Sequence, residues 1–182
     1  MELLIDTLET EIGAITLACV EGALRAVHFE RDESSMIGGL MAQFGAVTVR
    51  RSDNPLGYTE RFRAYLDRDF EALDEIRVEP AGTAFQQEVW RELRKVRPGT
   101  TVSYGMLAET IGKPSASRAV GMANAKNPIA IVIPCHRVIG SDGSLTGYAG
   151  GLVRKRWLLE HEGVRIDWGM PLFEVAGIAM AC

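Results

Sequence analysis

Three side chains in the second half of the chain could together carry out a nucleophilic substitution. Cys135 and His136 are adjacent in the segment PCHRV at residues 134–138, and Glu162 follows a stretch of helical periodicity at residues 152–160. A cysteine attacks as its thiolate, and only a small fraction of an ordinary thiol is ionised at neutral pH. Cys135 therefore needs a base, and His136 is the nearest residue that could serve as one.

The local geometry of the chain limits how His136 can reach Cys135. Neighbouring residues of an extended segment point to opposite sides, so contact between them requires a turn or a bridging water. Glu162 is the candidate for a third member, because a carboxylate at the C-terminal end of a helix is destabilised unless a cation or a polarised imidazole lies beside it. Against this interpretation, a single cysteine on an apolar strand is usually an inert core residue.

The periodicity of the second half predicts the elements that must hold these residues. Helices are expected at residues 85–93, 104–111, 115–125 and 152–160. The break GKPS at residues 112–115 separates two short helices, which is the pattern of a helix-turn-helix. The apolar run IAIVI at residues 129–133 is too short for a helix, so it is expected to bring Cys135 to the end of a buried, rigid segment. A glycine-rich loop then leads to the last helix.

The first half has the pattern of a small strand-rich domain. Residues 3–29 alternate between apolar and polar side chains with glycines between the runs, which predicts an antiparallel meander. The elements expected after it are a helix, a strand, an amphipathic helix and a strand, at residues 34–44, 46–50, 58–66 and 76–78. This half is therefore predicted to be α/β.

The linker-like sequence EPAGT at residues 79–83 predicts a domain boundary. We expect an α/β domain with a small antiparallel sheet at residues 1–80 and a mainly α domain with the helix-turn-helix at residues 81–170. An apolar tail at residues 171–182 has no assigned role.

Composition and charge narrow the class of protein. The 182 residues are 47% hydrophobic and 24% charged, as in a globular protein. Residues 1–80 hold 8 Lys/Arg against 16 Asp/Glu, and residues 81–182 hold 12 against 8, so a phosphate-facing surface is expected in the second half. No stretch approaches the roughly 20 apolar residues of a membrane helix. The first residues carry acids where a signal peptide carries Lys or Arg, so a cytoplasmic protein is expected.

The context of Cys135 resembles the active-site motif of the O6-alkylguanine-DNA alkyltransferases. The likeness covers nearly the whole second half, in the ordered segments FQQEVW at 85–90, VSYGMLAETIG at 102–112, SRAVGMANAKNP at 117–128, IPCHRVIG at 133–140, GYAGG at 147–151 and KRWLLEHEG at 155–163. The resemblance implies DNA repair by a single, irreversible transfer of an alkyl group from O6-alkylguanine to the protein. It implies no cofactor.

The resemblance also implies a role for each matching residue. Cys135 corresponds to the alkyl acceptor, His136 to the residue that takes the thiol proton through a water, and Glu162 to the residue that orients the histidine. Tyr104 corresponds to the tyrosine that donates a hydrogen bond to the everted guanine. Asn127 corresponds to a hinge asparagine between the DNA-binding helix and the active site.

Further residues correspond to groups that hold the base and the DNA. The backbone carbonyls of Cys135 and Val138 resemble those that accept from the exocyclic amine, and the amide of Ala149 resembles the one that donates to the guanine oxygen. Some relatives carry serine in place of Ala149. Arg118 corresponds to the arginine that fills the space left by the everted base. Small residues beside it would let the helix approach the minor groove closely, namely Ala116, Ser117 and Gly121.

The implied partner is double-stranded DNA carrying O6-alkylguanine, bound by a monomer without sequence preference. Cooperative binding and the range of alkyl groups are left open. The resemblance implies a ribonuclease-H-like fold for the first domain and a winged-helix-like fold for the second. Some relatives hold zinc in the first domain, but Cys19 and His28 are only two candidate ligands, so we predict no metal. The cysteines, Cys19, Cys135 and Cys182, are an odd set with no CxxC pair, which argues against a disulfide framework.

Three other functions remain open at this level. The first is a non-catalytic alkyltransferase-like protein, but those relatives replace the acceptor cysteine, commonly with tryptophan, whereas this chain keeps Cys135. The second is a helix-turn-helix regulator in which Cys135 is merely buried. The third is a cysteine hydrolase that uses the same Cys-His-Glu set on acyl or peptide bonds.

Overall fold

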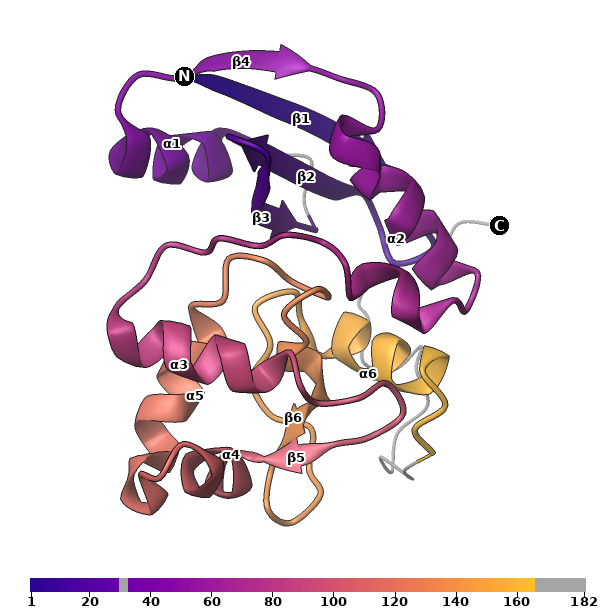
Figure 1. The fold of residues 1–182 in the computed structure, drawn as a ribbon. Helices are drawn as coiled ribbons and strands as arrows, with labels where there is room; N and C mark the ends of the chain where they lie inside the picture. Colours follow the sequence, from indigo (N-terminus) through magenta and orange to yellow (C-terminus); the bar gives the residue numbers. More distant parts are fainter. Residues whose placement is uncertain (30–32, 166–182) are drawn as a thin grey trace. The chain divides into compact units, whose positions relative to one another are not determined.

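The computed structural model describes residues 1–29 and 33–165, which are arranged in two compact units (Figure 1). The first unit comprises Met1–Gln87 and Asn127–Ile133, and the second comprises Glu88–Lys126 and the described residues from Pro134 onward. The expected tail at residues 171–182 lies outside the described residues, as do the last five residues of the domain expected at 81–170. The division at residue 80 stays a prediction.

A four-stranded sheet forms the centre of the first unit. Its strands are β1 (Glu2–Leu8), β2 (Ile15–Val20), β3 (Ala23–His28) and β4 (Thr48–Arg51), in the order β3-β2-β1-β4. The first three strands form the expected antiparallel meander. β4 pairs parallel to β1, so the sheet is mixed and the prediction of an antiparallel sheet is wrong for this strand. Helix α1 (Glu33–Phe44), which precedes β4 in the chain, supplies the crossover connection that a parallel strand needs.

The core of this unit lies between the sheet and its helices. Inward side chains of β1, β2 and β3 pack with Met36 and Leu40 of α1. Helix α2 (Tyr58–Leu66) buries Phe62 and Tyr65 completely. The strand expected at residues 76–78 is reduced to a single bridge between Leu24 and Val78. Short 3-10 turns at Pro55–Gly57 and Phe70–Leu73 flank α2.

The first unit also takes in the segment that precedes Cys135. The amide of Val27 donates to the carbonyl of Pro128 at 2.8 Å, and Val27 forms a parallel bridge with Ile129. The apolar run at residues 129–133 is thus attached to the edge of β3. Its backbone bends sharply at Ile131, which has a φ of 71°.

The second unit is mainly helical. Helix α3 (Ala84–Leu93) leads into it and begins with a capping box, in which the Thr83 hydroxyl accepts from the amide of Gln86 and the Gln86 side chain accepts from the amide of Thr83. The elements that follow are β5 (Val102–Ser103), α4 (Tyr104–Thr110), a 3-10 turn (Pro114–Ala116), α5 (Ser117–Ala125), a 3-10 turn (Cys135–Arg137), β6 (Val138–Ile139) and α6 (Leu152–His161). The expected helices are therefore confirmed, although α5 begins at Ser117, two residues after its expected start.

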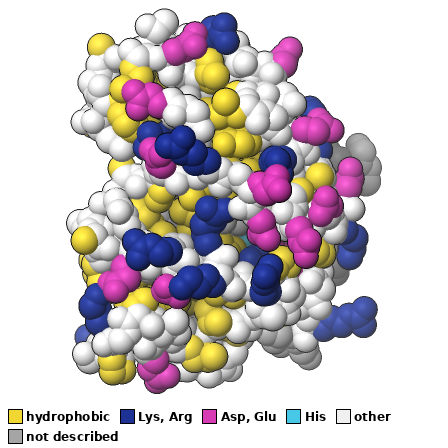
Figure 2. Space-filling view, in the orientation of Figure 1, with side chains coloured by type: hydrophobic (Ala, Val, Ile, Leu, Met, Phe, Trp, Pro, Cys, Tyr) yellow, Lys and Arg dark blue, Asp and Glu magenta, His cyan; other side chains and the backbone are white. Residues whose placement is uncertain are grey.

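The two units differ in the charges that they present. Figure 2 shows acidic side chains gathered over α2 and the turn that follows it, whereas lysine and arginine side chains gather over α3. None of the described helices has the length and hydropathy needed to cross a membrane.

Candidate active site

Cys135 lies in a tight turn within a buried segment. Cys135, His136 and Arg137 form one turn of 3-10 helix, and every residue from Pro134 to Ile139 is buried. The sequence analysis required a turn or a bridging water if His136 is to reach Cys135, and this 3-10 helix is such a turn. Cys135 is a thiol with 5% of its surface exposed and is not part of a disulfide within the described chain.

Pairing between two short strands places Tyr104 beside this segment. β5 and β6 pair in parallel, with Val102 opposite Val138 and Ser103 opposite Ile139. Tyr104 is the first residue of α4, directly after β5, and the Ser103 hydroxyl caps this helix by accepting from the amide of Met106 at 3.1 Å. The strand pair therefore joins the start of α4 to the end of the Cys135–Arg137 turn.

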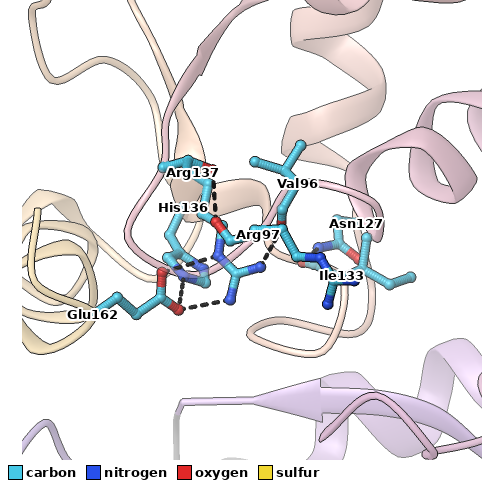
Figure 3. A network of polar contacts seen from close by, with 8 residues as sticks. Val96, Arg97, Asn127, Ile133, His136, Arg137 and Glu162 are labelled. Atoms are coloured by element: carbon cyan, nitrogen blue, oxygen red, sulfur yellow. Dashed lines mark hydrogen bonds and ion pairs between the residues drawn. The ribbon is translucent and has the colours of Figure 1, made fainter. Parts of the chain in front are cut away.

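A network of buried charges surrounds the His136 side chain (Figure 3). Nε2 of His136 lies 3.0 Å from Oε1 of Glu162, and both side chains are 0% exposed. Arg137 donates two hydrogen bonds to the same carboxylate, from Nε to Oε2 at 2.9 Å and from Nη2 to Oε1 at 2.8 Å. Its Nη1 donates to the carbonyl of Val96. The helix-end carboxylate thus has both compensating partners that the sequence analysis considered, an imidazole and a cation.

The pKa shifts in this network indicate which groups carry charge. Burial lowers the pKa of His136 and outweighs the opposing effect of Glu162. Burial alone would raise the pKa of Glu162, but His136 and Arg137 overcome it and hold the pKa below the ordinary range. Because the imidazole is neutral at pH 7 on this account, Arg137 is the cation that keeps Glu162 ionised.

The ionised carboxylate determines the tautomer of His136. An ionised Glu162 can only accept, so Nε2 of His136 carries the proton and Nδ1 keeps its lone pair. Nδ1 is buried and has no hydrogen-bond partner among the described protein groups. Buried polar atoms nearly always have a partner, so Nδ1 is suited to accept from a thiol or from a water between them. The ring of Tyr148 stands edge-on to the imidazole, with centroids 6.5 Å apart.

A buried lysine holds the loop that follows β6. Nζ of Lys155, on α6, donates to the carbonyls of Val138 at 2.6 Å, Thr146 at 2.5 Å and Gly147 at 3.5 Å. Burial lowers the pKa of Lys155 to about 8, while charge on Cys135 favours its protonated form. One ammonium therefore ties both β6 and the middle of the following loop to α6.

The loop itself turns tightly at Gly140. Its amide donates to the carbonyl of Ser144 at 2.9 Å, and Asp142 accepts from both the amide and the hydroxyl of Ser144. A Cβ atom at Gly140 would lie 2.5 Å from the Asp142 carboxylate and the Ser144 hydroxyl, so glycine is needed for this turn. The loop then continues to Ala149, which is exposed.

Helix α5 presents one side to the segment that contains Cys135. Nδ2 of Asn124 donates to the carbonyl of Cys135 at 3.3 Å, and Nε1 of Trp90 donates to the carbonyl of Ala123 at 2.9 Å. A Cβ atom at Gly121 would lie 3.7 Å from the Tyr104 ring, so the helix passes directly over this tyrosine. The other side of α5 is open to solvent and includes Arg118 in the first turn.

Asn127 bridges the segment that leads to Cys135. Its Nδ2 donates to the carbonyl of Ile133 at 2.7 Å, and its Oδ1 accepts from the amide of Ile129 at 3.0 Å. The side chain therefore closes the bend between the end of α5 and Pro134. These contacts are those of a brace, and a role as a hinge stays a prediction.

The remaining predicted residues are distributed around this core. Ala116 and Ser117 are partly exposed at the start of α5. The carbonyl of Val138 accepts from Lys155 and keeps a second lone pair for a ligand, whereas the carbonyl of Cys135 accepts from both the Asn124 side chain and the amide of Val138.

Sequence reasoning missed five residues that build the site, namely Asn124, Arg137, Thr146, Tyr148 and Lys155. A usable signal existed for two of them. Arg137 interrupts a long apolar run, and a buried arginine needs an anionic partner. Lys155 stands seven residues before Glu162, which is the spacing of one helix face.

The two candidate zinc ligands of the first unit do not meet. His28 pairs with Thr16 and Cys19 pairs with Leu24, so they are separated along the β2-β3 ladder. Within residues 1–29 and 33–165, no group of three His, Cys, Asp or Glu side chains could hold a metal.

Known proteins resemble this chain over up to 90% of its length. A family model described as 6-O-methylguanine DNA methyltransferase, DNA binding domain, matches residues 84–164. A methylated-DNA--protein-cysteine methyltransferase of Shigella flexneri is 43% identical over 166 residues, covering 90% of this chain and 97% of that protein. The crystal structure of Mycobacterium tuberculosis O6-methylguanine methyltransferase has a TM-score of 0.72 at 37% identity, covering 88% of this chain and 92% of that one. The structure of the M. tuberculosis OGT protein in complex with DNA has a TM-score of 0.70 at 37% identity, covering 89% and 92%.

A small mixed sheet followed by a mainly helical unit is thus an architecture with solved relatives. The chain belongs to the methylated-DNA--protein-cysteine methyltransferase family. The resemblance noted in the sequence is confirmed. The names of the relatives favour the catalytic interpretation over the non-catalytic one.

Proposed function

We propose that this protein repairs DNA directly, by transferring an alkyl group from the O6 atom of a guanine to the sulfur of its own Cys135. The observation that carries the proposal is the orientation of His136. Its Nε2 is committed to an ionised Glu162, and its buried Nδ1 is left to accept a proton one residue away from the thiol.

The chemistry needs one proton transfer and one substitution. The thiol proton passes to Nδ1 of His136 through a bridging water, and the thiolate attacks the alkyl carbon. The S–C bond forms as the C–O6 bond breaks, and the electron pair of that bond remains on the purine. The Tyr104 hydroxyl donates a hydrogen bond that offsets the developing charge. The purine then takes up a proton and becomes guanine.

The product explains why each molecule acts once. A thioether, unlike an acyl thioester, has no carbonyl for water to attack, and transfer consumes the thiol. Lys155 supports the reactive form, because its buried positive charge and the thiolate stabilise each other.

Chemistry at O6 also requires the base to leave the duplex, because this atom faces the pairing partner. Arg118 is exposed in the first turn of α5, where it can take the place of the base. The small residues Ala116, Ser117 and Gly121 leave room for a backbone beside it, which suits docking in the minor groove without sequence readout. The carbonyls of Cys135 and Val138 and the amide of Ala149 are proposed to hold the everted purine.

We further propose how the two units share this work. The second unit, with α4 and α5 as a helix-turn-helix of winged-helix type, binds DNA and carries the acceptor. The first unit is a ribonuclease-H-like support, which its three antiparallel strands and added parallel strand favour. Asn127 is the hinge between α5 and the acceptor turn. The protein acts as a monomer on double-stranded DNA.

The test is the mass of the intact protein after incubation with a duplex containing one O6-methylguanine. We expect every active molecule to gain one methyl group in place of the thiol proton, with peptide mapping locating it on Cys135. The Cys135→Ala variant should gain nothing and bind the same duplex with nearly unchanged affinity. Because burial raises the pKa of Cys19 to about 12, Cys19 should stay unmodified.

Other outcomes would support other functions. An unaltered mass together with tight binding to one operator sequence would favour a regulator. Turnover of a thioester or amide substrate would favour a hydrolase. A methyl group on Cys19 or Cys182 would overturn the assignment of the acceptor.

A further inference from the structure

Thr146, in the loop between β6 and α6, is held at both of its polar ends. Its Oγ1 donates to the Tyr104 hydroxyl at 3.3 Å, and its carbonyl accepts from Nζ of Lys155 at 2.5 Å. The first bond joins residues 42 positions apart, at the start of α4 and in the loop. Neither bond was expected from the sequence.

The backbone of Thr146 is fixed by the buried ammonium. Lys155 also donates to the carbonyls of Val138 and Gly147, so the loop is attached to α6 on both sides of Thr146. Bonds from a charged donor are among the stronger hydrogen bonds. A β-branched side chain on a fixed backbone has few rotamers available, so the direction of the Thr146 hydroxyl is well determined.

This bond affects the phenol of Tyr104. A phenol oxygen can accept a hydrogen bond and has a single hydrogen to donate. When Thr146 donates to this oxygen, the phenol hydrogen must point elsewhere. Acceptance also polarises the O–H bond, which makes the phenol a better donor. Gly121 of α5 faces this ring, and a Cβ atom added there would lie 3.7 Å from it, in van der Waals contact.

We propose that Thr146 is a positioning residue, whose hydroxyl directs the phenol hydrogen of Tyr104 toward the everted purine. The inference rests on the proposed function, from which it takes the role of Tyr104. It adds a residue that the resemblance did not assign, and it gives the buried Lys155 a second task, which is to hold the loop that carries Thr146.

The experiment is the single-turnover rate of methyl transfer from an O6-methylguanine duplex to the full chain. Thr146→Val keeps the β-branch and nearly the same volume but removes the donor, so we expect transfer about three- to tenfold slower, the effect of one neutral hydrogen bond. Thr146→Ser keeps the donor and should restore most of the rate. Ser141→Ala, at an exposed position of the same loop, is the matched control and should react like the wild type.

A double-mutant cycle separates positioning from general damage to the loop. If Thr146 acts through the phenol, Thr146→Val should slow the wild type but have no further effect on Tyr104→Phe. A loss of packing would instead slow both backgrounds alike. This comparison remains decisive if Thr146→Val lowers the melting temperature, because such damage would persist without the phenol.

The outcomes distinguish this inference from the proposed function. If the wild type transfers the methyl group and Thr146→Val is equally fast, the inference is wrong and the function stands. Equal slowing in both backgrounds, or a slow Thr146→Ser variant, would also overturn it. If the wild type gains no methyl group, the proposed function fails and the inference falls with it.

Discussion

Among substitutions near the active site that keep a side chain of similar length, Arg137→Met should lower the free energy of unfolding the most. The variant keeps most of the apolar stem but removes the cation from Glu162, whose side chain is 0% exposed. Two bonds to the carboxylate and one to the carbonyl of Val96 are lost together. Loss of one partner from a buried ion pair costs about 3–5 kcal/mol of the free energy of unfolding, because the remaining charge is poorly solvated. That is a large share of the roughly 5–15 kcal/mol that stabilises a protein.

The cost of this substitution should depend on pH. Without Arg137, the folded protein can relieve the buried carboxylate by binding one proton on the His136–Glu162 pair. A difference of one bound proton changes stability by about 1.4 kcal/mol per pH unit. The folded variant holds the extra proton. The difference in free energy of unfolding between the wild type and the variant should therefore shrink by up to about 2 kcal/mol as the pH falls from 7 to 5.5. The same proton would disable His136 as a base, so transfer should also be much slower.

Urea unfolding at both pH values measures the gap. Lys95→Met is the matched control, because it breaks the ion pair between Lys95 and Glu92, in which the lysine side chain is 66% exposed. This variant should lose no more than about 1 kcal/mol of the free energy of unfolding at either pH. Arg137→Met/Glu162→Gln removes the buried charge from both sides and should be more stable than Arg137→Met alone. A cost below about 1 kcal/mol, or a gap that does not change with pH, would refute the reasoning.

Three further predictions follow from the same contacts. The pKa values of His136 and Glu162 are both lowered in the folded state. Their contributions to the free energy of unfolding are therefore complete above the unfolded pKa values of about 6.5 and 4.3, and they are lost as the pH falls below those values. Glu162→Gln should make the free energy of unfolding depend less on pH in the acidic range. Gly99→Ala adds a Cβ atom 3.0 Å from the Glu162 carbonyl at a φ of 75°, whereas Gly112→Ala meets no atom within 4 Å at a φ of 70°. Gly99→Ala should therefore have the lower melting temperature of the two variants. Equal melting temperatures would contradict the close contact with Glu162. Arg118→Ala should slow transfer from duplex more than transfer from the free base, and equal losses would argue against its role in base eversion.

Local patterns in the sequence were sufficient for most helices and for the identity of the reacting residues. The helix from Ala84 to Leu93 and the helix that ends at His161 follow from apolar spacing and terminal signals that act within one or two turns. Cys135, His136 and Glu162 were found because two are adjacent and the third sits at a helix end. The direction of β4 could not be found in this way, because alternation along a strand does not specify which neighbour it pairs with or in which sense.

The reacting atoms and the family of the protein can be inferred from the amino-acid sequence, since both depend on residue types at short, ordered spacings. The bonds from Arg137 to the Glu162 carboxylate, and from Thr146 to Tyr104 across 42 residues of chain, are visible only in the folded protein. Such pairs are selected by packing, because a buried charge or hydroxyl must find a partner among whatever groups the fold brings within reach. The spacing of residues along the chain does not contain that information.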